Sequence, residues 1–493
     1  MRFTPFLFLV LLPAFLQAQS NRFSEFYDYD NGASGFLNVL TTEDGFVAQG
    51  TNFKNGIRQS HTIAIDSNGS LLSEHSVFDV QVGYESFAMI RLSSGQIVSA
   101  GSLCDLSEPS LGPCDFYFAR LNEEGDTLST HVYERRDTSD VVLSMVETRP
   151  NKIMLIGWTY NDTTNADADL LFITVDTLGN ELNRVVYGGG GTDFIGGGVV
   201  IDSTGDVVLA GFTGSFPASS SGRTWVVKTD SLGNVKWQRT YSGVCGVGSS
   251  AARICRLVDG NLIIAGGNTA FGGGGFGVDG SLMKIDTAGN LFWAKEYEVE
   301  GGQGLWSCSG LADGTIVANG VTDAGDGSQA GWLIKTDANG DTLWTRTFNP
   351  SSSTNFLRNM LIMPNGDIVA VGFGRGESST TQDGWILRVD SMGCEIENCF
   401  SVGIEESPFD SAQGTLVEVY PNPVTDVLHV RFANNPVHSS VVITITDMLG
   451  RVVLRFTEKG NTALDVTALK SGIYMLRTTD DNGISSSVKF VKE

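Results

Sequence analysis

Short apolar runs separated by glycine-containing turns recur at a regular spacing between residues 22 and 400. One recurring phrase is a turn followed by alternating or fully apolar residues that end in glycine, as in SGQIVSAG and TGDVVLAG. The closing glycines of its seven copies are Gly50, Gly101, Gly157, Gly211, Gly266, Gly320 and Gly372. Successive copies lie 51, 56, 54, 55, 54 and 52 residues apart, and such a period is typical of repeat architectures.

A second phrase recurs out of phase with the first and consists of an apolar strand, the residues D-x-x-G and another strand. Its glycines are Gly69, Gly125, Gly179, Gly233, Gly289, Gly340 and Gly393. Only the second copy departs from the pattern, with Asn122 in place of the Asp. Because Asp bonds back to the backbone and glycine adopts positive φ at little cost, each copy predicts a tight turn between two strands.

Each repeat unit has room for four strands of five to seven residues, and no helical period of useful length interrupts them. The pattern therefore predicts an all-β protein whose residues 19–400 form a seven-bladed β-propeller. A linear β-solenoid is the alternative, although its rungs are usually shorter. Large aromatic residues close several units, and we expect them to pack between blades: Trp237, Tyr241, Trp293, Tyr297, Trp344 and Phe348.

The two ends of the repeat region predict how the ring closes. Residues 23–27 (FSEFY) resemble an outer strand that has no unit of its own, whereas the last unit ends in CEIENCF, a poor outer strand. We expect residues 22–28 to pair into the blade made by residues 354–400, because this pairing would bury both sheet edges at the seam.

Residues 1–18 have the features of a secretory signal peptide. Arg2 precedes an apolar run from Phe6 to Leu16, and Ala18 ends the segment before a polar stretch. The run is too short to span a bilayer, which needs about 20 apolar residues, and no other stretch approaches that length. We therefore expect an exported protein with no membrane span, whose mature chain begins near Gln19.

The C-terminal residues differ from the repeats. Residues 401–416 are polar and acidic and predict a linker, and residues 417–493 hold short alternating strands that predict a small β-sandwich. Four phrases stand out within this region: YPNP at 420–423, DMLGR at 447–451, LKSGIY at 469–474 and KFVK at 489–492.

These phrases closely resemble the type A C-terminal sorting domain of the type IX secretion system. On this resemblance the sorting motif comprises Pro421, Asn422, Pro423, Gly450, Gly472 and Tyr474. The resemblance implies an Ig-like fold, recognition by the type IX secretion machinery, and passage through the periplasm and across the outer membrane of a Gram-negative bacterium. The domain is usually removed, and the passenger is then secreted or attached to surface lipopolysaccharide. An ordinary Ig-like module that binds carbohydrate is the alternative.

The fourth unit, which begins at Tyr187, resembles the repeat of secreted bacterial β-propeller proteins, a resemblance that implies fold and not activity. The chain has 493 residues, with 56 acidic and 32 basic side chains and a net charge of −24. Binding to phosphates needs clustered Lys and Arg, so nucleic acid and anionic lipid are excluded as partners. The 60 glycines and 12 prolines suit a β-protein with many tight turns.

The seven cysteines fit an oxidising compartment. Close spacing favours two disulfides, Cys104–Cys114 and Cys394–Cys399. The pairing of Cys245, Cys255 and Cys308 stays open, because one of the three must remain unpaired or pair outside the chain. Neither close pair has C-x-x-C spacing or a neighbouring His, so a zinc site is not expected.

Candidate chemistry is sparse. The five histidines have no H-E-x-x-H spacing, and no G-x-S-x-G motif is present. Each copy of the first phrase opens on a turn with a glycine or its equivalent, and the residues four positions before it form an inner ring: Thr41, Arg91, Glu147, Ile201, Arg256, Gly310 and Ile362. No catalytic residue or cofactor is assigned. Calcium is the one metal considered, because residues 161–169 place several oxygen donors on one loop, yet without a complete calcium-binding frame.

The sequence therefore indicates an exported, non-catalytic propeller that binds a glycan or a protein outside the cell. The long loops around residues 102–115, 158–169, 213–223 and 268–281 would carry recognition. The alternative is an extracellular carbohydrate-active enzyme, a hydrolase or lyase with its site in the propeller funnel. Such an enzyme needs a cluster of acids or histidines, and the inner ring offers one acid, Glu147.

Overall fold

The computed structural model divides the chain into two compact units, Met1–Glu397 and Asn398–Glu493. The structure describes residues 22–28, 32–54, 57–77, 82–105, 114–134, 139–160, 168–216, 223–241, 250–267, 280–297, 304–325, 328–350, 354–376, 381–395, 417–432, 440–447, 452–480 and 485–492. Every regular element among them is a β-strand, which confirms the all-β prediction. The predicted signal peptide lies outside the described residues.

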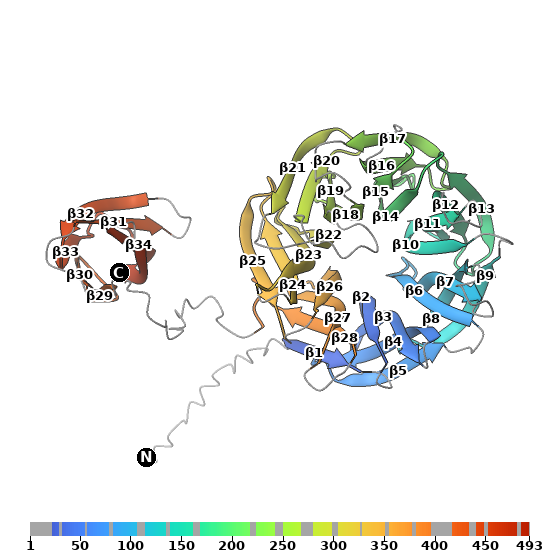
Figure 1. The fold of residues 1–493 in the computed structure, drawn as a ribbon, viewed down its shortest axis with the longest axis horizontal. Coiled ribbons are helices and arrows are strands. Elements are labelled where there is room, and N and C mark those ends of the chain that lie inside the picture. Colours follow the sequence, from blue (N-terminus) through green and yellow to red (C-terminus); the bar gives the residue numbers. More distant parts are fainter. Residues whose placement is uncertain are drawn as a thin grey trace, which may run out of the picture. The chain divides into compact units, whose positions relative to one another are not determined.

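The described residues of the first unit form seven four-stranded antiparallel sheets, arranged in a ring with one strand of each nearest the centre (Figure 1). These sheets are the blades of a β-propeller and are numbered here in chain order. Blade 1 comprises β2 (Ser34–Thr41), β3 (Gly45–Lys54), β4 (Ile57–Asp66) and β5 (Leu71–Val77). Blade 2 comprises β6 (Val82–Arg91), β7 (Ile97–Asp105), β8 (Cys114–Leu121) and β9 (Thr127–Tyr133). Blade 3 comprises β10 (Asp140–Arg149), β11 (Lys152–Tyr160), β12 (Ala168–Val175) and β13 (Glu181–Tyr187).

The remaining blades repeat the same order from the centre outward. Blade 4 comprises β14 (Asp193–Val200), β15 (Val207–Thr213), β16 (Arg223–Thr229) and β17 (Val235–Tyr241). Blade 5 comprises β18 (Ser250–Arg256), β19 (Leu262–Gly267), β20 (Gly280–Ile285) and β21 (Leu291–Tyr297). Blade 6 comprises β22 (Gly304–Gly310), β23 (Ile316–Asp323), β24 (Gln329–Thr336) and β25 (Thr342–Phe348). Blade 7 comprises β26 (Phe356–Ile362), β27 (Ile368–Gly374), β28 (Asp383–Val389) and β1 (Phe23–Tyr27).

The D-x-x-G phrase forms the turn between the third and fourth strands of each blade. In blade 1, Asp66 Oδ1 accepts hydrogen bonds from the backbone nitrogens of Asn68 and Ser70, both at 2.8 Å. Gly69 has φ 89°, a conformation that glycine adopts without the steric cost borne by other residues. The same arrangement recurs in later blades, where the accepting residues are Asp176, Asp230, Asp286, Asp337 and Asp390.

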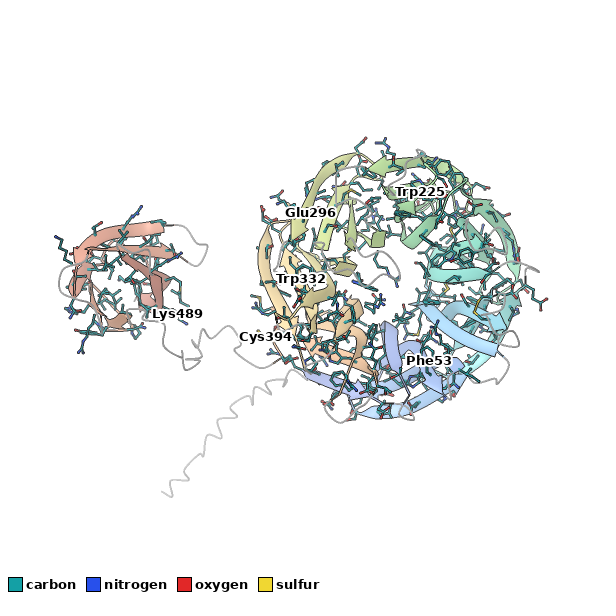
Figure 2. The ribbon with its side chains drawn as sticks, in the orientation of Figure 1. Phe53, Trp225, Glu296, Trp332, Cys394 and Lys489 are labelled. Atoms are coloured by element: carbon teal, nitrogen blue, oxygen red, sulfur yellow. A yellow bond between two sulfur atoms is a disulfide. The ribbon has the colours of Figure 1, made fainter. Side chains whose placement is uncertain are left out.

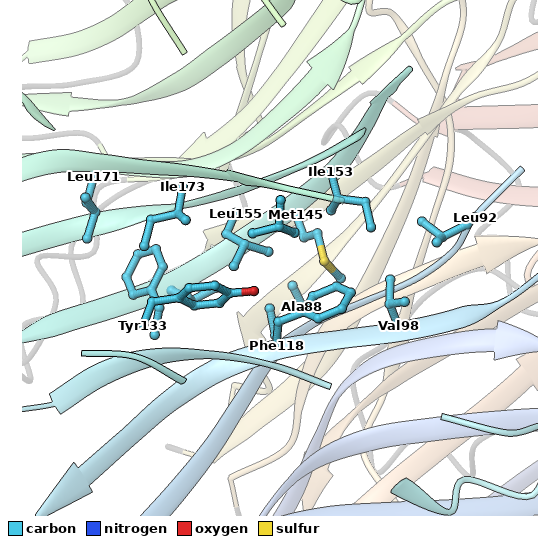
Figure 3. Packing of buried hydrophobic residues seen from close by; sticks show 14 residues of the cluster. Ala88, Leu92, Val98, Phe118, Tyr133, Met145, Ile153, Leu155, Leu171 and Ile173 are labelled. Carbon is cyan, nitrogen blue, oxygen red and sulfur yellow. The ribbon is translucent and has the colours of Figure 1, made fainter. Parts of the chain in front are cut away.

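The core lies between neighbouring blades rather than within one sheet. Figure 3 shows one such layer, in which Phe118 and Tyr133 of blade 2 face Leu155 and Ile173 of blade 3. The middle strands are buried on both faces, and their continuous apolar runs suit this position. Burial of each large apolar side chain stabilises the fold by roughly 1.5–3 kcal/mol.

The aromatic residues that close the units pack between blades, as predicted. The Trp237 ring lies within 3.0 Å of the position that a Cβ on Gly289 of the next blade would occupy. The rings of Trp293 and Trp344 lie similarly close to the Cβ positions of Gly340 and Gly393 in the blades that follow. A side chain larger than hydrogen at these turn positions would collide with the tryptophan of the preceding blade.

The N-terminal strand closes the ring, which confirms the predicted pairing of residues 22–28 with the last blade. β1 pairs antiparallel with β28, with Phe23 opposite Arg388 and Tyr27 opposite Gly384. The Phe26 ring stacks on Trp385 at 5.9 Å between centroids. Both chain ends of the repeat region are thereby held in one sheet.

The cysteines follow the predicted pattern where the structure describes them. Cys104 and Cys114 form a disulfide between paired strands β7 and β8. Cys394 is disulfide-bonded, and its predicted partner Cys399 lies outside the described residues, as does Cys245. Cys255 and Cys308 are free thiols whose sulfur atoms lie 2.7 Å apart, on the inner strands of blades 5 and 6.

The second unit is a two-sheet sandwich, as predicted. One sheet comprises β29 (Val417–Tyr420), β30 (Val427–Phe432) and β33 (Thr462–Asp465). The other comprises, in spatial order, β32 (Val452–Lys459), β31 (Ser440–Asp447), β34 (Gly472–Asp480) and β35 (Ser485–Lys492). Side chains of both sheets, among them Leu428, Ile443 and Leu476, form one buried core. Figure 2 labels Lys489 on the last strand of this unit and Trp225 and Trp332 within the propeller blades.

Candidate functional site

The predicted inner ring lies at the end of the blades that carries the hairpins between the first and second strands. Two of its charged members contact neighbouring blades. Arg91 hydrogen-bonds both carboxylate oxygens of Glu123 and donates to the backbone oxygen of Thr41 at 2.7 Å. The hydrogen bond from Arg91 lowers the pKa of Glu123, as expected for an ion pair. These contacts join blade 2 to blade 1.

Glu147, the one acid of that ring, also bridges two blades. Its carboxylate accepts hydrogen bonds from the backbone nitrogen of Ser93 at 2.6 Å and from the Ser93 hydroxyl at 2.9 Å. Arg256, the third charged member, is exposed. The three residues therefore do not converge on one described site.

One member of the predicted ring is misplaced by one residue. Val200 pairs with Val207 in blade 4, as Arg91 pairs with Ile97 in blade 2, so Val200 and not Ile201 holds the ring position. The first hairpin of blade 4 is one residue longer, because Ile201 bonds to Asp206 where Leu92 bonds to Gln96. Ile201 instead contributes to the buried core.

Every inner strand carries a β-bulge at the same level. The register of the inner strand skips one residue in each blade, and the skipped residues are Leu37, Phe87, Leu143, Gly196, Ala252, Trp306 and Arg358. A bulge breaks the alternation of side chains and redirects one of them. A strict two-residue period in the sequence therefore cannot locate these positions.

The bulge residues of blades 6 and 7 are in direct contact. The guanidinium carbon of Arg358 lies 3.2 Å from the centroid of the Trp306 ring and 5.3 Å from that of Phe373. The Arg358 Nε is buried and has no hydrogen-bond partner among the residues that the structure describes. Arg358 forms no ion pair with any carboxylate of that part of the chain. Its guanidinium group instead contacts aromatic rings.

A second arginine, Arg253, lies on the inner strand of blade 5 at nearly the same level. Arg253 follows the bulge of β18, the position that Ser307 and Asn359 hold in the next two blades. Burial, and to a lesser degree the charge of Arg253, lowers the pKa of Arg358 to about 9. Arg358 is therefore still a cation at neutral pH, and the charge of Arg253 acts on it from blade 5, across blade 6.

The same level carries a polar belt in the blades that follow. Ser307 Oγ donates to Asn359 Oδ1 at 3.1 Å, Asn359 Nδ2 donates to the backbone oxygen of Leu37 at 3.2 Å, and Asn38 Nδ2 donates to that of Phe87 at 3.0 Å. These bonds link blades 6, 7, 1 and 2. The polar side chains of this belt thus have hydrogen-bond partners in the neighbouring blades, whereas Arg253 and Arg358 form no hydrogen bond with the belt.

Two pairs of partly exposed phenylalanine rings lie at equivalent positions, Phe356 with Phe373 and Phe194 with Phe212. Phe356 packs on Phe373 at 4.8 Å between centroids in blade 7, beside Arg358. Phe194 contacts Trp158 at 4.8 Å and Phe212 at 6.4 Å, between blades 3 and 4. Such rings offer flat apolar faces for a ligand.

The loops named for recognition all connect the second and third strands of blades 2 to 5. Because neighbouring strands are antiparallel, these loops and the first residues of the inner strands lie at the same end of the blades. Arg358 and Trp306 are each the third residue of their strand and so lie toward that end. The loop segments 106–113, 161–167, 217–222 and 268–279 lie outside the described residues.

Two histidines of the propeller pair with acidic side chains of the blades. His61 Nε2 lies 2.8 Å from Glu74 Oε1, and His75 Nδ1 lies 2.9 Å from Asp126 Oδ1. Within the described ranges no group of three His, Cys, Asp or Glu side chains could hold a metal ion. Most of the loop considered for calcium lies outside those ranges.

In the second unit, three of the four motif phrases meet. Asn422 Oδ1 accepts a hydrogen bond from the backbone nitrogen of Val491 at 2.8 Å, and Asn422 Nδ2 donates to the oxygen of Lys489 at 3.3 Å. The Tyr474 ring stacks on Phe490 at 5.7 Å. The YPNP segment and LKSGIY are thus both held against the terminal KFVK strand.

The other motif residues are placed as follows. The Tyr474 hydroxyl donates to the backbone oxygen of Lys470 at 2.9 Å, which closes the turn that precedes β34. Gly472 has space for a Cβ, whose nearest contacts would be at 3.8 Å. Pro421 and Pro423 are exposed, and Gly450 lies outside the described residues.

The geometry agrees with a match to a known family. Residues 418–493 match the family model of the secretion system C-terminal sorting domain. This sorting tail directs the protein to the cell surface or the extracellular space. The resemblance to the type IX sorting domain in the sequence is thereby confirmed. No curated protein matches the chain, and no helix of the described residues is long and apolar enough to cross a membrane.

Solved structures resemble the chain only distantly. An α-L-arabinanase of Penicillium chrysogenum in complex with arabinobiose is 13% identical, with a TM-score of 0.42 over 62% of this chain and 93% of that chain. An α-L-arabinofuranosidase of Fusarium graminearum with arabinobiose is 12% identical, with a TM-score of 0.42 over 64% and 94%. Puromycin hydrolase is 12% identical, with a TM-score of 0.43 over 81% and 58%. All three scores lie below 0.5, so no activity is drawn from them.

Proposed function

We propose that this protein is an exported glycan-binding module, in which the propeller is the passenger and the sorting tail is its address. The observation that carries the proposal is the group of Arg358, Trp306, Phe356 and Phe373 at the loop end of the inner strands. Partly exposed aromatic rings beside an unpaired cation suit a ligand that has both CH-rich faces and polar groups. The sorting tail supplies delivery to the outside of the cell.

A protein ligand is the second possibility for the same module, and the long loops around residues 102–115 and 158–169 would take part in either case. We favour a glycan because the described rings offer flat faces rather than a broad apolar patch. After sorting, the propeller would be released or held on surface lipopolysaccharide, as the type IX resemblance implies.

Enzymatic hydrolysis is the competing proposal. A glycosidase usually needs two carboxylates in one site, and the one acid of the predicted ring, Glu147, hydrogen-bonds Ser93 of the neighbouring blade. This contact gives Glu147 a structural role and supports binding over cleavage.

A panel of polysaccharides separates these proposals. The purified full-length protein is immobilised, and each polysaccharide is scored for retention and for new reducing ends or unsaturated products. We expect retention of at least one polysaccharide with no cleavage. Reproducible cleavage that is lost in Glu147→Gln would overturn the binding proposal, and retention of none would reject a glycan ligand.

A further inference from the structure

Two arginines of the inner strands, Arg253 and Arg358, have no carboxylate partner among the described residues. Several cations of the propeller form ion pairs: Arg91 with Glu123, Lys236 with Asp206 and Arg388 with Asp367. Arg120, Arg149 and Arg239 also have no carboxylate partner among the described residues, but each donates hydrogen bonds to neighbouring oxygen atoms. Arg253 and Arg358 donate no hydrogen bond to a described residue, and a buried cation needs a compensating group.

The Trp306 ring holds the Arg358 guanidinium in a fixed orientation. Stacking at 3.2 Å covers one face of the guanidinium, and Phe356 and Phe373 flank it at 5.9 Å and 5.3 Å. Rings can cover only the faces of a guanidinium, so its N–H edge still needs acceptors. The buried and unpartnered Nε lies on that edge.

The fork of an arginine matches a planar carboxylate, which accepts two parallel N–H bonds. Arg253 adds a second cation within electrostatic reach, from the strand two blades away in the ring. One carboxylate placed between them would reduce the repulsion of the two guanidinium groups and would satisfy the free N–H edge.

We propose that Arg253, Trp306 and Arg358 form a subsite for the carboxylate of an acidic sugar, a uronate unit within a polysaccharide. The proposal rests on the glycan-binding function above and names its ligand class. The guanidinium groups bind the carboxylate, and the partly exposed Phe356 and Phe373 rings contact the CH face of the sugar ring. Aromatic contact of this kind favours a uronate over a bare inorganic anion.

The negative surface of the protein gives this subsite an unusual response to salt. The net charge of −24 repels a polyuronate at long range, whereas the two arginines attract its carboxylate at short range. Moderate salt screens the long-range repulsion more than the short contact. We therefore expect the association rate to rise, and not to fall, on going from low to physiological ionic strength.

The test measures binding of oligogalacturonate to the full-length protein by calorimetry, beside the same oligosaccharide after chemical reduction of its carboxyl groups. We expect binding of the acidic form and a loss of at least about ten-fold on reduction. Arg358→Gln and Arg253→Gln should each weaken binding of the acidic form by a similar factor. Arg358→Lys keeps the positive charge but loses the forked N–H geometry, so it should bind the acidic form as weakly as Arg358→Gln does.

Arg256→Gln is the matched control, because Arg256 lies three residues after Arg253 on β18, at the short-hairpin end, and is exposed. It should leave affinity unchanged. If Arg358→Gln fails to fold, as judged by circular dichroism, Arg253→Gln and the reduced oligosaccharide still decide the matter.

Three results would overturn the subsite. Equal binding of the acidic and reduced oligosaccharides would leave the glycan-binding function standing but reject the carboxylate. Binding of a sulfated polysaccharide or of polyglutamate that equals or exceeds binding of the uronate, with the same dependence on both arginines, would assign the site to another anion. Failure of oligogalacturonate to bind at all would reject the uronate, and the wider polysaccharide panel would then show whether the glycan-binding function fails with it.

Discussion

Trp385 Nε1 donates a hydrogen bond to Ser24 Oγ at 3.0 Å, across 361 positions of sequence. Equivalent tryptophans in blades 4 and 6 bond within their own repeat, Trp225 to Gln238 and Trp332 to Thr345. Ser24 thus takes the place of an outer-strand residue that blade 7 does not supply from its own unit. The ring is closed by the same contact that completes an ordinary blade.

The seam predicts a specific loss of stability. Trp385 is fully buried, so Ser24→Ala leaves its indole N–H without a partner and should lower the free energy of unfolding by about 1–3 kcal/mol. Denaturant unfolding followed by tryptophan fluorescence measures this change. Glu25→Ala is the control, because Glu25 lies on the same strand with an exposed side chain and should shift stability little. Equal shifts for both variants would contradict the role given to Ser24.

Among the residues that the structure describes, four tyrosine hydroxyls join consecutive blades. The hydroxyls of Tyr27, Tyr133, Tyr241 and Tyr297 donate to the backbone oxygens of turn glycines in the next blade at 2.6 to 2.9 Å. Tyr241→Phe should lower the free energy of unfolding by about 1 kcal/mol, since it removes one such bond. Tyr187 holds the same place in blade 3 but makes no hydroxyl bond to a described residue, so Tyr187→Phe is the matched control. A loss as large in the control would refute this function of the hydroxyl.

The same tyrosines predict an alkaline limit of stability. Burial raises the pKa of Tyr241 to about 12 and raises the pKa values of Tyr27 and Tyr133 further. In the unfolded chain the phenol loses its proton near pH 10. The unfolded state therefore binds fewer protons above that pH, and the free energy of unfolding should be independent of these groups below pH 10 and fall as the pH rises toward 12. Denaturant unfolding curves at several pH values should show that the free energy of unfolding falls less steeply with pH in Tyr241→Phe. An unchanged slope would contradict the contribution given to Tyr241.

Cys255 and Cys308 are placed to form an inter-blade disulfide, with their sulfur atoms 2.7 Å apart. Incubation with glutathione disulfide in mildly alkaline buffer should convert both thiols to one disulfide, with two protons and two electrons passing to give two glutathione molecules. Burial raises the pKa of the Cys308 thiol, so the reaction should be slow at neutral pH. Mass spectrometry of the peptides detects the cross-link, and Cys255→Ser should abolish it. Reaction of the folded, oxidant-treated protein with an alkylating agent at both cysteines would exclude the pair.

Much of the propeller was predictable because its turns have a chemical signature. The Asp and Gly of each D-x-x-G phrase perform a backbone function that few other residues can replace, so they mark the unit length directly. The strand of residues 23–27 was recognisable because an outer strand without its own unit has to pair with a blade that lacks one.

The candidate site was not predictable from the same pattern. Arg358 and Trp306 lie at bulges, where the two-residue period of the strand fails and a side chain changes direction. Counting back from the turn glycine led instead to Glu147 and Arg91, which join blades, and to Ile201 in a longer hairpin. A contact between residues 306 and 358, in neighbouring blades, appears only once the repeats are stacked.

The division of the chain into a passenger and a transport tail is tested most directly by removing residues 417–493 and locating the product in cell fractions. We expect the truncated propeller to remain folded and to accumulate in the periplasm, while the full-length chain reaches the surface or the medium. Asn422→Ala, which removes both bonds to the terminal strand, should impair export of the full chain. Normal surface display of the truncated protein would contradict the assignment of the tail.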